Sequence, residues 1–170
     1  MTPKSREEAA QTAGKKAREY MTQYGSCAQS TMLALQDAFD MRDDNVFKAA
    51  GALTGGIGGM QDACGSLLSA CLMFGAAFGR GISEYGNKEK LGESQTASGK
   101  LYKWHEKEFG SPTCLKIRTA FGGGIYYDMR VPWLAEMAKE AGVSGKCVEL
   151  VEKTATRAAQ MIWDTLNKEK

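Results

Sequence analysis

A chain of 170 residues is long enough for one domain, which at this size buries about 70% of its unfolded surface without needing disulfides. Its 22 lysines and arginines against 20 acidic residues give a net charge of +2, which lacks the strong basic excess typical of nucleic-acid binding. Five cysteines accompany a single histidine, and we expect residues 1–170 to form one helical domain with a four-cysteine site.

The amino-terminal segment is charged and rich in alanine, without the short apolar core of a secretory signal. The longest uncharged run, residues 63–79, is shorter than the roughly 20 apolar residues that span a bilayer. We therefore expect a cytoplasmic protein without a membrane partner. In a reducing cytoplasm, cysteines are expected to be core residues, metal ligands or redox-active thiols rather than structural disulfides.

Apolar residues recur every three or four positions almost throughout, which predicts an all-α fold, a compact bundle of about six to eight helices. Capping residues and glycines set the expected helix bounds. The predicted helices cover approximately residues 5–23, 26–39, 43–53, 62–79, 87–109, 111–121, 132–142 and 144–166. The stretch 125–131 is expected to be irregular. Tyr126, Tyr127, Met129 and Trp133 cluster in and beside it, where they either shape a partner surface or cover the core, and we expect them to cover the core.

The helix predicted from about 62 to 79 differs from the others because both of its faces are apolar. We expect it to be surrounded on all sides at the centre of the bundle, with Asp62 as its N-cap. The preceding TGGIGG segment, residues 54–59, should be a loop, since each glycine inside a helix costs about 1 kcal/mol. This loop is either a tight turn or a backbone cradle for a bound group.

Four of the five cysteines fall in predicted first helical turns, one to three residues after a capping residue. The cap and cysteine pairs are Ser26 and Cys27, Asp62 and Cys64, Ser111 and Cys114, and Ser144 and Cys147. The positive end of a helix stabilises a thiolate and lowers its pKa, so this placement favours metal binding or thiol chemistry. Inert core packing remains an alternative for all of them. Cys71 lies in a helix middle, as a packing residue would.

The segment GGIGGMQDACGSLLSACLMFG around Cys64, with Cys27, Cys114 and Cys147, resembles the redox-active family named for its pattern C-GCAxxG-C-C. The resemblance covers roughly residues 17–150. It implies a small protein with four characteristic cysteines, one within a CGAxxG motif after a glycine-rich loop. A related module in split-Soret cytochromes is associated with an iron–sulfur centre. In this chain Ser66 and Ser69 replace the alanine and the final glycine of the motif.

The resemblance implies that Cys27, Cys64, Cys114 and Cys147 hold an iron–sulfur cluster, [2Fe–2S] or [4Fe–4S], and exchange electrons with an oxidoreductase partner. No substrate chemistry of its own is expected. The family's habit of sharing clusters, with an aromatic patch near Trp133, suggests a homodimer.

Two other functions compete with the iron–sulfur hypothesis. In a thiol–disulfide redox protein, Cys64 would pair with Cys71 or Cys27. In a binding module, zinc would be held by the four cysteines, although no paired C-x-x-C knuckle is present. The single histidine, His105, could be a haem ligand or proton carrier, but is expected to be a packing residue.

Overall fold

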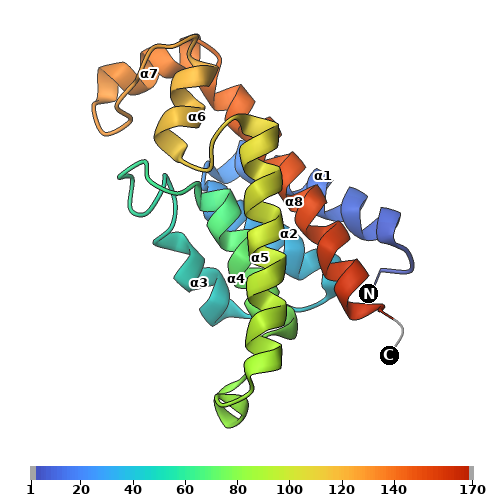
Figure 1. Cartoon of the computed structure of the whole chain (residues 1–170). Helices are drawn as coiled ribbons and strands as arrows, with labels where there is room; N and C mark the ends of the chain where they lie inside the picture. The colour runs from blue at the N-terminus through green and yellow to red at the C-terminus, as the bar shows by residue number, and fades with distance from the viewer. Residues whose placement is uncertain (1–2, 169–170) are drawn as a thin grey trace.

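The computed structural model describes residues 3–168, and within that range it contains α-helices, one 3-10 turn and no strand (Figure 1). The predicted all-α bundle is confirmed. The helices are α1 (Arg6–Tyr24), α2 (Cys27–Phe39), α3 (Asp44–Gly51), α4 (Gly65–Phe78), α5 (Lys88–Phe109), α6 (Cys114–Phe121), α7 (Pro132–Glu140) and α8 (Val143–Leu166), with η1 (Ile82–Glu84) before α5.

Helix α4 is the centre of the bundle, because it contacts α2, α3, α5 and α8. Its central position agrees with its apolar sequence, but it is not enclosed on every side. Leu72, Gly75 and Ala76 are exposed, because no helix covers that flank of its carboxyl-terminal half. Helices α1 and α8 also pack together over a long interface lined largely by alanine.

The first three predicted helices begin as expected, with Ser5, Ser26 and Asp43 each accepting a hydrogen bond from a backbone N–H of the first turn. Three later predicted starts are wrong. The N-caps are Cys64 for α4 rather than Asp62, Thr113 for α6 rather than Ser111, and Gly142 for α8 rather than Ser144.

The physical reason for the first two errors is a backbone bridge between residues 61–64 and 112–115. The N–H of Cys64 donates to Pro112 O over 2.9 Å, and the N–H of Cys114 donates to Asp62 O over 2.7 Å. These extended residues satisfy each other's backbone groups, so both helices begin only after the bridge. In α8, the left-handed Gly142 lets the chain turn directly from α7, which places Cys147 in the second turn.

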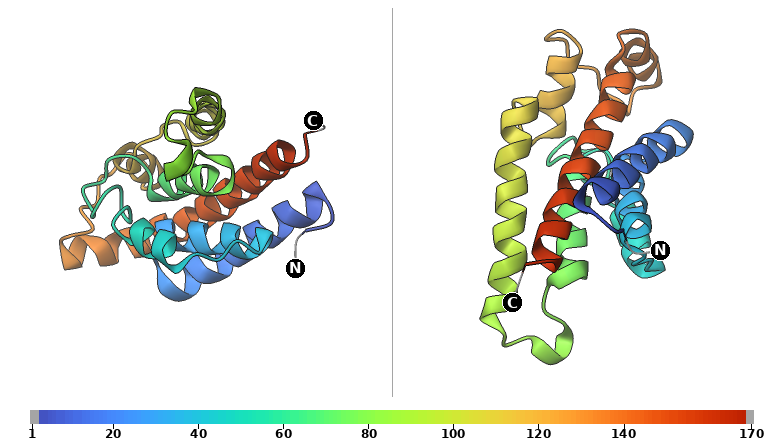
Figure 2. Two further views of the ribbon diagram at one scale, coloured as in Figure 1. Left: turned by 90° about the horizontal axis from the view of Figure 1, so that it is seen from below. Right: turned by 90° about the vertical axis from the view of Figure 1, so that its right-hand side faces the viewer.

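Helices α6 and α7 and the segment between them lie at the opposite end of the molecule from the η1 turn (Figure 2). Tyr127, Ala138 and Val143 form a small second core there. The prediction that the aromatic residues of this region cover the core is right for Tyr127 and wrong for Tyr126 and Trp133, which are 43% and 64% exposed. Within residues 3–168, none of the helices has the length and apolar character needed to cross a membrane.

Asp37 links α1 to α2 from a nearly buried position, since its side chain is only 2% exposed. Burial opposes its ionisation, but hydrogen bonds from Arg42, Lys16 and Tyr20, each 2.6 Å long, outweigh burial and lower the pKa of Asp37 to about 2. Burial and the Asp37 carboxylate raise the pKa of Tyr20 to about 12.

Asp37→Asn is expected to lower the free energy of unfolding by about 2 kcal/mol, because three donors lose a charged acceptor. The pKa of Asp37 is lower in the folded than in the unfolded protein. Its carboxylate therefore stabilises the fold above about pH 4, and this stabilisation is lost as the pH falls toward 2. Urea unfolding of both proteins at neutral pH measures the difference. Asp44→Asn is the control, since its pair with Lys48 is exposed, and an equal loss there would contradict the prediction.

Candidate functional site

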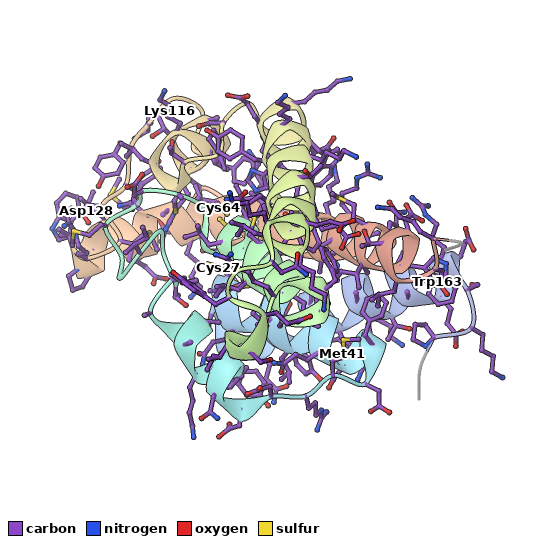
Figure 3. The ribbon with its side chains drawn as sticks, turned by 60° about the horizontal axis from the view of Figure 1, so that its bottom comes forward. Cys27, Met41, Cys64, Lys116, Asp128 and Trp163 are labelled. Atoms are coloured by element: carbon purple, nitrogen blue, oxygen red, sulfur yellow. The ribbon has the colours of Figure 1, made fainter. Side chains whose placement is uncertain are left out.

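Cys27 and Cys64 meet where the first turn of α2 packs against the start of α4. A Cβ atom built on Gly65 would lie 2.9 Å from Cys27 Sγ and 2.6 Å from Leu53 O, so only glycine fits after Cys64. In Figure 3 the labelled Cys27 and Cys64 lie close together, while Met41 and Trp163 lie far from them; Cys64 is buried and Cys27 is half-buried. The glycine of the motif therefore lets two sulfur-bearing segments approach.

Cys114 joins this pair through the backbone bridge described above, which fixes the start of α6 beside the start of α4. The electrostatic interactions between the thiols follow this arrangement. Cys64 interacts with Cys27 and Cys114, and Cys114 also interacts with Cys27. Three of the four expected site cysteines therefore come together around two helix starts and a bridge.

Cys147 completes the group from α8, where it packs against the small second core. Its thiol interacts electrostatically with both Cys27 and Cys114. Cys71 stays outside the group, and the Ser98 side chain, rather than another cysteine, is the neighbour that acts on its thiol. The structure thus separates the cysteines into four and one, the same division that the sequence predicts.

The pKa values of these thiols differ from the sequence prediction. Burial raises the pKa of Cys114 to about 12 and that of Cys147 to about 11, and it also raises the pKa of Cys27 and Cys64 above its ordinary value. Repulsion from neighbouring thiolates adds to the shift at Cys64 and Cys114. The prediction of low-pKa thiols is therefore wrong for the free cysteines, because burial outweighs the helix ends.

Backbone N–H groups nevertheless favour the charged form of two of the sulfurs. The amides of Gly55 and Ala28 lower the pKa of Cys27, and those of Leu67 and Ser66 lower that of Cys64, although burial is the larger effect at both. None of these contacts has ordinary hydrogen-bond geometry, and the Cys64 side chain makes no capping bond. They act as oriented dipoles near the sulfurs rather than as strong bonds.

Residues 55–59 form a left-handed turn, with φ between 60° and 81° at five successive positions. Four of these are glycine, which adopts such angles freely, and the fifth is Ile57. The turn brings the Gly55 amide to Cys27, so the glycine-rich loop is both a tight turn and part of the surroundings of the site. The segment TGGIGG can therefore be a tight turn and, at the same time, supply backbone groups to the site.

Arg118 is a site residue that the sequence analysis missed. It follows Cys114 by one helical turn on α6, and its positive charge acts on Cys27, Cys114 and Cys147. Its Nε atom is buried and has no hydrogen-bond partner. The i, i+4 spacing from Cys114 was the available signal, but it became meaningful only once Cys27 and Cys147 were placed nearby.

The two serines that depart from the family motif have different environments. Ser66 is buried and shares a 2.7 Å hydrogen bond with the Thr31 hydroxyl, which connects α4 to α2. Ser69 is also fully buried, but its hydroxyl has no partner. The first substitution therefore adds an interhelical contact beneath the site, whereas the second adds an unsatisfied group to the core.

His105, on α5, points into the protein core and has no exposed surface, as expected for a packing residue. Its ring packs edge-on against Phe109, with 4.7 Å between ring centroids. Neither ring nitrogen forms a hydrogen bond of ordinary geometry. Burial lowers the pKa of His105 to about 4, which a nearby Ser111 backbone group opposes only weakly.

Four thiols provide the donor set typical of iron–sulfur clusters, and neither a carboxylate nor a histidine is among the groups that shift their pKa values within residues 3–168. The unpartnered Arg118 Nε and the close approach at Gly65 also fit a buried anionic group there. Among residues 3–168, no three or more Cys, His, Asp or Glu side chains are arranged closely enough to hold a single metal ion.

Comparison with known proteins gives one family. The family model described as "Putative redox-active protein (C_GCAxxG_C_C)" matches residues 25–161, most of the chain and all four site cysteines. No curated protein and no solved structure matches.

Proposed function

Since the chain belongs to the C_GCAxxG_C_C family of redox-active proteins, we propose that Cys27, Cys64, Cys114 and Cys147 hold an iron–sulfur cluster that exchanges electrons with an oxidoreductase. The observation that carries the proposal is the approach of four cysteines from four separate parts of the chain to one place, where Cys64 is buried and the other three are half-buried. Such convergence is how helical bundles build cofactor sites from single residues.

The residues of the site would have distinct roles. The four cysteines would be the ligands, and a bound cluster would supply one-electron redox chemistry. Gly65 lets Cys27 and Cys64 approach, and the amides near these sulfurs favour their thiolate forms. The helices around the site limit the access of water, as the low exposure of Cys64, 6%, indicates.

The thiol–disulfide alternative is less well supported. A thiol attacks a disulfide as the thiolate, and reactive cysteines are usually exposed and low in pKa. Burial raises the pKa of all five cysteines here. A bound metal, in contrast, binds the thiolate directly and offsets the cost of burying its charge.

Purification without oxygen tests the proposal. We expect a brown protein that absorbs near about 400 nm and contains roughly two or four irons with matching sulfide per chain. Colourless protein with one zinc per chain would contradict it. Colourless, metal-free protein that forms a reversible disulfide would instead support the thiol–disulfide alternative.

Cys64→Ser is expected to remove nearly all of the iron, because a serine oxygen is a poor replacement for a buried thiolate ligand. Cys71→Ser is the matched control in the same helix, and it should retain the iron of the parent protein. Circular dichroism of both variants separates loss of the site from loss of the fold. Equal iron loss in two folded variants would sink the assignment of the ligands.

A further inference from the structure

A cavity of about 360 Å³ lies between the end of α1, the first half of α2 and α3. Its walls are largely apolar and aromatic, formed by Tyr20 and Tyr24 of α1, Leu33 of α2 and Phe47 of α3. Protein cavities that bind small molecules have volumes from about 300 Å³ upward and are mostly apolar, with a few polar groups. This cavity therefore has the size and character of a site for a small ring compound.

The cavity is separate from the four-cysteine site, although both use the start of α2. The α2 residues that line it recur every three or four positions and so share one face of the helix: Ser26, Gln29, Ser30 and Leu33. Cys27 and Thr31 belong to another face, because Cys27 Sγ lies near Gly65 and the Thr31 hydroxyl bonds to Ser66, both at the start of α4. The same turn of α2 thus presents one face to the cysteines and another to the cavity.

Hydrogen bonds hold the walls of the cavity in place. The Tyr20 hydroxyl donates to the Asp37 carboxylate over 2.6 Å, and the Gln29 side chain donates to Phe47 O over 3.4 Å. Tyr24 stands at the edge, 67% exposed, with 6.4 Å between its ring centroid and that of Tyr20. Because these walls are already formed, a ligand would lose less free energy to ordering them on binding.

The polar groups and charges around the cavity indicate the class of ligand. Among residues 3–168, no lysine, arginine, aspartate or glutamate lines it, so no charge there would compensate an ionised ligand. The aromatic walls favour a planar ring, which can make stacked or edge-on contacts. Ser30 is only 3% exposed, and its hydroxyl has no hydrogen-bond partner among the described residues. Buried polar groups usually have a partner, so this hydroxyl is available to a bound molecule.

We propose that this cavity is a binding site for a small, uncharged, planar aromatic molecule. The ring of the molecule contacts Tyr24 and Phe47, and a polar substituent hydrogen-bonds to the Ser30 hydroxyl. The molecule lies against a different face of the helical turn that carries Cys27, in a place lined by no cysteine among the described residues. The inference goes beyond the proposed function and does not depend on it.

Isothermal titration calorimetry with indole tests the proposal on the full chain as purified. Indole is an uncharged two-ring aromatic molecule with one N–H group, and we expect saturable binding. Indole-3-acetate, which carries a carboxylate, should bind about tenfold more weakly. Adamantanol, an uncharged but non-planar ring compound, should bind about fivefold more weakly. Absence of saturable indole binding would overturn the proposal, and equal affinity for either other compound would overturn the class of ligand.

Two variants and one control test the location of the binding. Tyr24→Ala removes an exposed part of the wall and Ser30→Ala removes the hydroxyl, and each should weaken indole binding about fivefold. Tyr102→Ala should bind indole like the parent, because this tyrosine is exposed on α5 and does not line the cavity. Circular dichroism checks that all three variants fold. Parental affinity in both cavity variants, or an equal loss in Tyr102→Ala, would overturn the location.

Iron analysis of the same sample separates this proposal from the proposed function. A parent protein that binds indole but no iron would overturn the cluster and support the cavity as a binding site. A parent protein that binds iron but no indole would overturn the binding site and leave the cluster supported.

Discussion

Gly65→Ala is expected to destabilise the protein by roughly 2–3 kcal/mol, and to lower its iron content if the four cysteines bind a cluster. The new Cβ would lie 2.6 Å from Leu53 O and 2.9 Å from Cys27 Sγ, well inside normal contact distances. The carbonyl belongs to the backbone of the segment after α3, and Cys27 lies on α2, so relief requires the start of α4 to move away from both. Such a movement would separate Cys64 from Cys27.

Gly75→Ala is the matched control, because Gly75 lies in the same helix and a Cβ there would meet nothing within 4 Å. Alanine in a helix is more favourable than glycine, so this variant should gain about 0.5–1 kcal/mol. Urea unfolding at neutral pH measures both variants. Changes of the same sign in the free energy of unfolding of the two variants would contradict the close packing inferred at Gly65.

The second large effect concerns acid stability and His105. An unfolded histidine gains a proton below about pH 6.5, whereas the folded His105 stays neutral until about pH 4. The folded state therefore loses stability as the pH falls from about 6.5 and reaches its full loss near pH 4. The loss amounts to roughly 3 kcal/mol for a shift of this size.

His105→Met should remove this pH dependence while keeping stability at neutral pH within about 1 kcal/mol, since the two side chains have similar volumes. Because His105 is the only histidine, no other imidazole contributes between pH 6.5 and 4. The free energy of unfolding, measured at several pH values in both proteins, provides the test. If the free energy of unfolding changes equally with pH in both proteins, His105 is not the titrating group.

His105→Gln separates titration from polarity in the same experiment. Glutamine does not titrate but retains a polar group in a place where the histidine nitrogens have no hydrogen-bond partner. It should therefore lose the pH dependence and also be less stable than His105→Met at neutral pH. A variant with the parental pH dependence would exclude the burial of this side chain as the cause.

The helical fold could be predicted because it depends on local patterns. The three- and four-residue spacing of apolar side chains, and caps such as Ser26 and Asp43, are properties of neighbouring residues. The predicted helix starts were wrong where a segment distant in the chain forms hydrogen bonds with the residues before the helix. The bridge between Ala63 and Thr113 delays both α4 and α6, and its two sides are far apart in the chain.

The sequence also set four cysteines apart from Cys71. Part of the reasoning, however, relied on predicted helix starts that the structure does not share. Cys64 is a cap rather than a first-turn residue, and Cys147 lies one turn deeper than expected. The family pattern selected the same residues independently of these starts. Whether the four bind a cluster stays a prediction that iron analysis can test.

By itself, the sequence determined the helices, the central apolar segment and the four distinctive cysteines, because each depends on local spacing or on a short motif. Only the tertiary structure decided the chemistry around the sulfurs. Burial, which raises the pKa of the thiols, depends on how helices pack together. The same packing places the charge of Arg118 where it acts on cysteines of α2, α6 and α8.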